Sequence, residues 1–213
     1  MALRVNIHPE NPQYRLIDTV VERLKRGAVM LYPTDTVYAI GCDINSKSGQ
    51  AHIRKLRNLP LHKPLTFVAA SISQISDYAK ISDNAYQIIR RLVPGPFTFL
   101  LPATKMVPNL VLNPKRNITG IRVPGHFLCQ TLVAELGNPL ISMSARLPDW
   151  EEPETNEEMF DMFDKHVDII IEVDAEYRSP DGDNLSTMID FTEDIPRIIR
   201  EGLGIELASE LVM

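Results

Sequence analysis

The sequence of 213 residues has few of the features that mark specialised classes of protein. Its two cysteines, Cys42 and Cys129, are too few for a disulfide scaffold, so we expect reduced thiols and a cytoplasmic protein. No apolar run approaches the roughly 20 residues of a membrane-spanning helix. The N-terminus lacks the long apolar segment of a secretory signal. We therefore expect no membrane partner.

Motifs of several large enzyme classes are also missing. There is no Gly-x-x-x-x-Gly-Lys-Ser/Thr phosphate loop, no Gly-x-Gly-x-x-Gly after a strand, and no Gly-x-Ser-x-Gly. The five histidines are scattered without the spacing of metal ligands, so we predict no protein-held metal. These absences leave hydrolases and classical nucleotide-binding folds unsupported.

Composition and charge describe an ordinary globular protein with an acidic balance. Hydrophobic residues make up 44% and charged residues 23% of the chain, and its length suits one domain, residues 1–213. The net charge of −6 argues against broad, charge-driven binding of nucleic acid. Cations nevertheless cluster between residues 54 and 63 and again between residues 105 and 122. A basic cleft in an acidic protein suits a nucleotide phosphate, and solvated basic faces are the alternative.

Strand-like and helix-like segments alternate along the chain. We expect helices at residues 12–26, 48–58, 82–93, 127–136 and after a Thr155-x-x-Glu158 capping box. We expect strands at residues 28–32, 65–70, 97–101, 118–123, 139–143, 167–173, 186–191 and 197–200. This alternation predicts an α/β fold: a twisted, largely parallel mixed open sheet flanked by helices in a single domain.

Residues 33–43 (PTDTVYAIGCD) are the most informative stretch. Two threonine hydroxyls and an acid follow a buried strand there, and strand ends in α/β sheets are where small ligands usually bind. Hydroxyl groups can hold the carboxylate or hydroxyl of a small polar molecule. The alternative is a polar turn between two core strands.

Arg122 is unusual because it falls inside an apolar strand pattern. A buried arginine is costly unless it is paired, so we expect Arg122 to meet a protein carboxylate or an anionic ligand.

Four segments, in order and spacing, resemble the YrdC/YciO family, which includes the threonylcarbamoyl-AMP synthases. Residues 33–43 resemble the signature Pro-Thr-(Glu/Asp)-Thr-Val-Tyr-Gly-Leu-Gly, and residues 94–98 resemble Pro-Gly-Pro-(Leu/Phe)-Thr. Residues 120–124 with 142–146, and residues 186–190 with 200–202, resemble the remaining elements. The resemblance covers about residues 12–204 and implies the YrdC-like fold.

The resemblance also implies an activity: an L-threonylcarbamoyladenylate synthase, a nucleotidyltransferase that acts on ATP, L-threonine and bicarbonate, with Mg²⁺ accompanying ATP. Family members of this kind serve tRNA modification. By the same likeness, the residues expected around the amino acid are Thr36, Arg122, Ser144 and Ser186. Those expected around the nucleotide are Arg57, Lys63, Arg146 and Arg200.

Two departures from the synthase pattern point to the YciO branch. The synthases carry Lys-x-Arg-Pro where this chain has Arg57, Asn58, Leu59 and Pro60, and they carry an asparagine where it has Arg146. Three hypotheses follow. The protein is an active synthase, weak or with an altered substrate, in which Arg146 compensates for Leu59; or it binds a nucleotide or RNA without turnover; or it senses a small metabolite.

Overall fold

The computed structural model describes residues 1–60, 63–109, 111–112, 117–148, 151–180 and 184–212. The strands within these residues are β1 (Leu3–Asn6), β2 (Met30–Tyr32), β3 (Ala39–Asp43), β4 (Thr66–Val68), β5 (Phe97–Pro102), β6 (Ile118–Arg122), β7 (Leu140–Ser144), β8 (Ile169–Glu172), β9 (Thr187–Asp190) and β10 (Arg197–Arg200). The helices are α1 (Tyr14–Lys25), α2 (Lys47–Leu56), α3 (Ile72–Tyr78), α4 (Asp83–Leu92), α5 (Phe127–Leu136), α6 (Asn156–Phe163) and α7 (Ile205–Val212).

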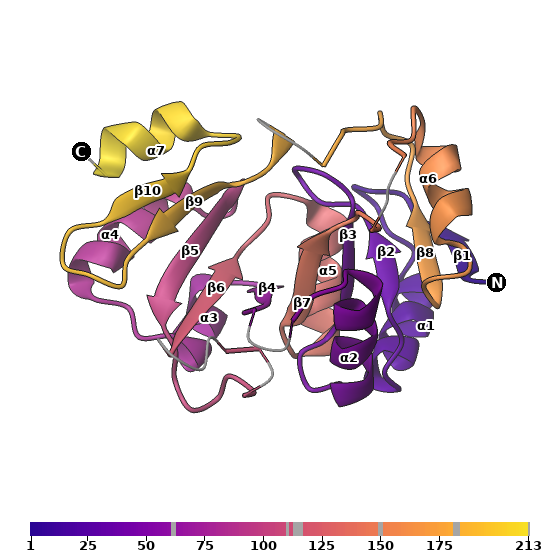
Figure 1. The fold of residues 1–213 in the computed structure, drawn as a ribbon, viewed down its shortest axis with the longest axis horizontal. Helices are drawn as coiled ribbons and strands as arrows, with labels where there is room; N and C mark the ends of the chain where they lie inside the picture. The colour runs from indigo at the N-terminus through magenta and orange to yellow at the C-terminus, as the bar shows by residue number, and fades with distance from the viewer. Residues whose placement is uncertain (61–62, 110, 113–116, 149–150, 181–183, 213) are drawn as a thin grey trace.

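The described strands form one sheet of ten, in the order β1-β8-β2-β3-β7-β4-β6-β5-β9-β10, and Figure 1 shows how it runs across the molecule. The expected α/β fold with a mixed open sheet flanked by helices is confirmed. Parallel pairing is less dominant than predicted: four described pairs are parallel and five are antiparallel. The reason is that β2 and β3, and likewise β5 and β6, follow one another without a crossover helix, so each pair runs antiparallel.

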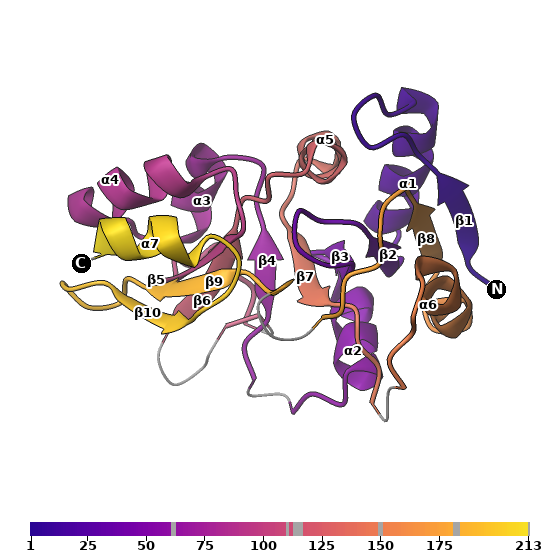
Figure 2. The same ribbon diagram turned by 90° about the horizontal axis from the view of Figure 1, so that it is seen from above.

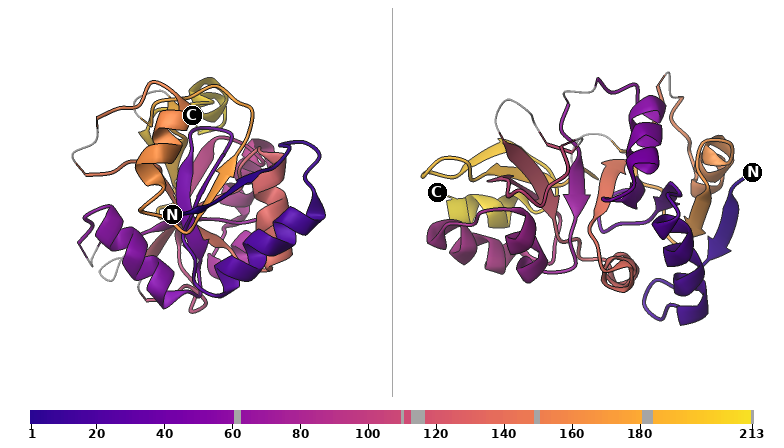
Figure 3. Two further views of the ribbon diagram at one scale, coloured as in Figure 1. Left: turned by 90° about the vertical axis from the view of Figure 1, so that its right-hand side faces the viewer. Right: turned by 90° about the horizontal axis from the view of Figure 1, so that it is seen from below.

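Helices cover the two faces of the sheet unequally. Figure 2 shows α1, α3, α4 and α5 together on one face, and the right-hand view of Figure 3 shows the same layer from below. Helices α2 and α6 lie on the opposite side. The middle strands β4, β6 and β5 have no helix over that second face in these views.

The hydrophobic core lies between the middle strands and the four-helix layer. Phe67, Phe99, Ile121 and Ile141 come from four adjacent strands, face one another in the strand register and are all fully buried. The ring of Phe67 packs edge-on against Tyr78 of α3, which identifies this face as the helix-covered one. Because side chains alternate along a strand, their sequence neighbours point to the other face.

Several expected helix ends are confirmed. The hydroxyls of Ser82 and Thr155 accept hydrogen bonds from the backbone N–H groups three residues on, as N-caps do. Gly27 and Gly137 adopt positive φ angles of 95° and 75° where helices end. Helix α1 begins at Tyr14, two residues after the expected start, and its N-cap residue Gln13 makes no side-chain capping bond.

The solvated basic face raised as an alternative for the cations of residues 54–63 does not hold for Arg54, which is only 5% exposed. Its guanidinium donates to the carbonyls of Pro60 and Lys63, both at 2.9 Å, because the chain after α2 folds back over it. Of the second cationic cluster, Lys115 and Arg116 lie outside the described residues. No helix in the described part of the chain is long and apolar enough to cross a bilayer.

Candidate functional site

A cavity of about 430 Å³ opens over the middle strands, on the face opposite the four-helix layer. Strand residues two apart supply much of its wall: Thr66 and Val68, Thr98 and Leu100, Gly120 and Arg122, Ser142 and Ser144. These residues alternate with the buried core residues described above, so the strands that build the core also build this cavity. The signature segment contributes Thr34, Thr36 and Val37, and residues 185–200 close the other side with Leu185, Ser186, Met188 and Arg200.

The electrostatics of this cavity favour an anion. Four of the described residues that line it carry a positive charge and none carries a carboxylate; the cations are Arg57, Lys63, Arg122 and Arg200. Hydroxyl groups from four threonines and three serines of the wall provide hydrogen bonds of either sense. A ligand with several negative charges and hydrogen-bonding groups fits this surface best.

Arg122 is the central cation, and it is 92% shielded from solvent since only 8% of its surface is exposed. One terminal nitrogen, Nη1, donates to the hydroxyl of Thr36 at 2.9 Å, and Nη2 donates to Oδ1 of Asp35 at 2.5 Å. The expectation that a buried Arg122 meets a carboxylate is therefore met by Asp35. The buried Nε of Arg122 has no acceptor among the described residues.

Thr36 owes its position to the turn that links β2 and β3. The hydroxyl of Thr34 donates to the carbonyl of Val37 at 2.7 Å and accepts from the backbone N–H of Thr36 at 3.1 Å. The two threonine hydroxyls lie 3.0 Å apart. Residues 33–38 are thus a polar turn between two core strands, and Thr34, Thr36 and Val37 of this turn form part of the cavity wall.

Ser186 and Arg200 form a second, connected group. The hydroxyl of Ser186 lies 2.8 Å from that of Thr98, and Nη2 of Arg200 donates to it at 2.9 Å. Nε and Nη2 of Arg200 also donate to the carbonyl of Ser186. Burial, and secondarily the charge of Arg122, lowers the pKa of Arg200. Position 202, next to Ser186, has room only for glycine, because a Cβ there would lie 2.2 Å from the carbonyl oxygen of Leu185.

Not all of the residues predicted to bind the nucleotide lie on the cavity wall. Arg57 and Lys63 line the cavity, whereas Arg146 is exposed and its side chain is not part of the described wall. Arg146 contributes its carbonyl, which accepts from Nη1 of Arg57 at 2.5 Å. Burial, and secondarily Arg146, lowers the pKa of Arg57. Leu59 packs partly buried against the core instead of lining the cavity.

Seven of the eight predicted site residues therefore line one cavity: Thr36, Arg122, Ser144, Ser186, Arg57, Lys63 and Arg200. The predicted site residues do not include Asp35, Thr66, Thr98 and Ser142. The need of Arg122 for a carboxylate could have pointed to Asp35, because that acid neighbours Thr36 in the sequence. Thr98 and Ser142 lie within segments that resemble the family, whereas Thr66 carries no sequence signal beyond being a polar residue within a strand.

Metal binding by the protein itself finds little support. No cluster of three or more His, Cys, Asp or Glu side chains in the described part of the chain could hold a metal ion. The cavity also lacks carboxylates among its described lining residues, and these are the groups by which proteins usually hold Mg²⁺. These residues do not fit a protein-held Mg²⁺.

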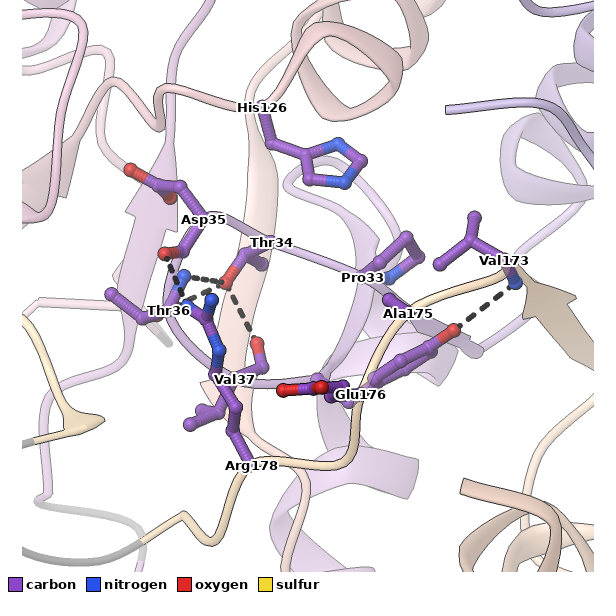
Figure 4. A pocket seen from close by; sticks show the side chains of 11 residues that line it. Pro33, Thr34, Asp35, Thr36, Val37, His126, Val173, Ala175, Glu176 and Arg178 are labelled. Atoms are coloured by element: carbon purple, nitrogen blue, oxygen red, sulfur yellow. Dashed lines mark hydrogen bonds between the residues drawn. The ribbon is translucent and has the colours of Figure 1, made fainter. Parts of the chain in front are cut away.

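A second cavity, of about 220 Å³, lies on the other side of the signature turn. Figure 4 shows His126, Glu176 and Arg178 around it, with Asp35 and Thr36 on the shared turn. Burial lowers the pKa of His126, and the charge of Asp35 opposes part of that change. The turn thus separates two cavities, and Asp35 lines only the smaller one.

The fold and this site define an α/β protein with a cation-lined ligand cavity over the open face of its sheet. The family model of the Sua5, YciO and YrdC proteins, described as telomere recombination, matches residues 22–202. The chain therefore belongs to this family.

Relatives from two branches of the family resemble the chain. The uncharacterized protein YciO of Escherichia coli K12 is 39% identical over 199 residues, which is 93% of this chain and 94% of YciO. The threonylcarbamoyl-AMP synthase of Vibrio vulnificus is 30% identical over 158 residues, 73% of this chain and 84% of the synthase.

Solved structures agree. The crystal structure of E. coli YciO superimposes with a TM-score of 0.86 at 38% identity, covering 96% of this chain and 97% of YciO. Sua5 of P. abyssi in complex with L-threonine superimposes with a TM-score of 0.87 at 25% identity, covering 99% of this chain and 61% of Sua5.

Proposed function

We propose that this protein is a threonylcarbamoyl-AMP synthase, which transfers AMP from ATP to the N-carboxylated form of L-threonine. The observation that carries the proposal is the content of the larger cavity. It combines a buried, hydroxyl-supported guanidinium, Arg122, with three further cations and with no carboxylate among its described lining residues. The V. vulnificus synthase and the threonine-bound Sua5 of P. abyssi support the choice of substrate.

The proposed reaction asks little covalent chemistry of the protein. The amine of L-threonine takes up bicarbonate to form a carbamate and water. A carbamate oxygen then forms a bond to the α-phosphorus of ATP, the bond from that phosphorus to the β,γ-phosphates breaks, and pyrophosphate leaves. Catalysis of such a step rests on positioning and on neutralising charge.

Arg122 and Thr36 are assigned to the carboxylate and hydroxyl of L-threonine. A guanidinium matches a carboxylate in shape and charge, and Arg122 is already held in place by Thr36 and Asp35. The hydroxyls of Ser144 and Ser186 lie on the same cavity wall and complete the amino-acid side.

Arg57, Lys63 and Arg200 are assigned to the nucleotide phosphates. Arg200 is preorganised by its three bonds to Ser186, so it binds without first being ordered. We assign no contact to the side chain of Arg146 and propose instead that its carbonyl holds Arg57 in position. Mg²⁺ belongs to this proposal only as part of the ATP substrate.

A second candidate function is binding of a nucleotide, or of RNA, without turnover. It is favoured by residues 59 and 146. Leu59 is uncharged and packs against the core, and the side chain of Arg146 is not part of the described cavity wall. The cavity therefore has fewer phosphate contacts than the Lys-x-Arg-Pro pattern of the synthases would provide.

Mass spectrometry of the purified protein with ATP, Mg²⁺, L-threonine and labelled bicarbonate tests the proposal. We expect labelled threonylcarbamoyl-AMP with the wild-type protein and none above background with Arg122→Ala. The control Arg91→Ala removes an exposed arginine of α4, on the far face of the sheet, and is expected to retain activity. Nucleotide binding without product would support the second candidate, and steeply salt-dependent affinity for RNA would support its RNA form.

A further inference from the structure

Asp35 occupies an unusual position between the two cavities. Its Oδ1 accepts from Arg122 and its Oδ2 accepts from the backbone N–H of Gly125 at 2.7 Å. The carboxylate therefore ties the signature turn to the segment that follows β6. Its side chain is 14% exposed and that of Arg122 is 10% exposed, so both ends of the ion pair are largely shielded from water.

The geometry points to Asp35 as the residue that positions Arg122 for the carboxylate of the substrate. This inference rests on the function proposed above and deepens it. Asp35 does not line the larger cavity, so it acts on a ligand there only through Arg122. Asp35 is therefore a positioning residue, because it orients Arg122 and does not itself contact the ligand.

Asp35 has two opposing effects on Arg122. As a counter-charge it weakens the attraction of Arg122 for a second carboxylate. As a hydrogen-bond acceptor it fixes the plane of the guanidinium, together with Thr36, and thereby aims the remaining N–H groups. A planar fork binds a carboxylate well only when its orientation matches. Nε has no acceptor among the described residues, so the bonds to Thr36 and Asp35 alone fix the plane of the guanidinium, and we infer that orientation is the larger effect.

The smaller cavity supplies a direct test of this role. Because Asp35 lines that cavity, shortening its side chain would leave a void that joins a space of about 220 Å³. Formate is a free carboxylate small enough to enter such a void and to accept from Arg122 in place of Asp35. The asparagine of Asp35→Asn removes the charge but occupies the same space as the aspartate, so formate has no place to bind in that variant.

The experiment measures L-threonine binding by calorimetry for the wild type, Asp35→Ala and Asp35→Asn, each with sodium formate or sodium chloride. We expect Asp35→Ala to bind L-threonine about 10- to 100-fold more weakly, as for the loss of one oriented charged contact. Formate, and not chloride, should restore most of that loss in Asp35→Ala and none of it in Asp35→Asn. Unchanged or tighter binding by Asp35→Ala would mean that Asp35 is only a competing counter-charge, and would overturn the inference.

Crystal structures of Asp35→Ala with and without formate separate this inference from the proposed function. In the crystal of Asp35→Ala without formate, we expect the guanidinium of Arg122 to move away from Thr36. In the crystal with formate, we expect it to return to Thr36. If the wild-type protein binds no L-threonine, the proposed substrate is wrong, yet the movement of Arg122 still decides the role of Asp35. A guanidinium that keeps its place in Asp35→Ala would overturn the role. Asp35→Ser, which also shortens the side chain, serves the same comparison if the alanine variant does not fold.

Discussion

Neighbouring residues of β5 meet opposite environments. Phe99 is fully buried beneath the helix layer, whereas Thr98 and Leu100 line the larger cavity. The same alternation runs through β4 and β6, where Phe67 and Ile121 lie on the covered face and Thr66 and Arg122 on the open one. Stability and ligand binding are thus assigned to opposite faces of the same strands, so single substitutions should separate them.

The largest expected effect is on the covered face. Phe99→Ala should lower the free energy of unfolding by about 3–5 kcal/mol, because it leaves a cavity in a closely packed core. Leu100→Ala, its neighbour on the open face, is only half-buried and should cost about 1–2 kcal/mol. Chemical denaturation of both variants checks this difference. Equal losses would contradict the division between the two faces.

The next effect is on the open face. Arg57→Ala should weaken nucleotide binding about 10- to 100-fold, because one hydrogen-bonded charge contact to phosphate is lost. Its effect on L-threonine binding should be small, since Arg57 is assigned to the other end of the cavity. Separate calorimetric titrations with an ATP analogue and with L-threonine measure the two affinities. Lys55→Ala is the matched control, because Lys55 is exposed on α2 and is not part of the described cavity wall.

A gain of function sharpens the comparison with the synthases. The double variant Leu59→Arg, Arg146→Asn restores the side-chain types of the synthase pattern and should raise the rate of adenylate formation about tenfold, as one added phosphate contact would. The carbonyl that holds Arg57 is kept in this variant. The rate of pyrophosphate release measures the change. A lower rate than that of the wild type would show that Leu59 and Arg146 suit this protein's own substrate better.

The smallest effect concerns pH. Burial lowers the pKa of His126, so the folded protein favours the neutral ring and the unfolded chain takes up a proton more readily. The stabilisation is fully present above the ordinary histidine pKa of about 6.5 and is lost as the pH falls below it. His126→Gln should therefore flatten the fall in unfolding free energy between pH 7.5 and pH 5. An unchanged slope would show that other groups cause it.

Much of the site could be predicted from the sequence because its chemistry is local. Hydroxyls at a strand end and an arginine within an apolar strand are visible without a fold, and the resemblance to the family supplied their roles. The directions of Leu59 and Arg54 could not be predicted, because they depend on how the chain after α2 folds back. That of Arg146 depends on how the segment after β7 meets Arg57, which is distant in the sequence. Strand β1 and helices α3 and α7 were missed because each is short and owes its stability to packing against the rest of the molecule.

The strand β3 was missed for a different reason. The strands predicted from the sequence do not include its residues, 39–43, yet all five are buried and the strand pairs with both β2 and β7. A buried strand between two neighbours has apolar residues on both faces, so it shows no alternation to mark it.

The most direct test of the central claim is a crystal structure of the protein with L-threonine and a non-hydrolysable ATP analogue. We predict that both ligands occupy the open face, with the threonine carboxylate on Arg122 and the phosphates on Arg57, Lys63 and Arg200. Ligands bound in the smaller cavity, on the helix-covered side, or not at all at saturating concentrations would contradict the assignment of function to the open face of the sheet.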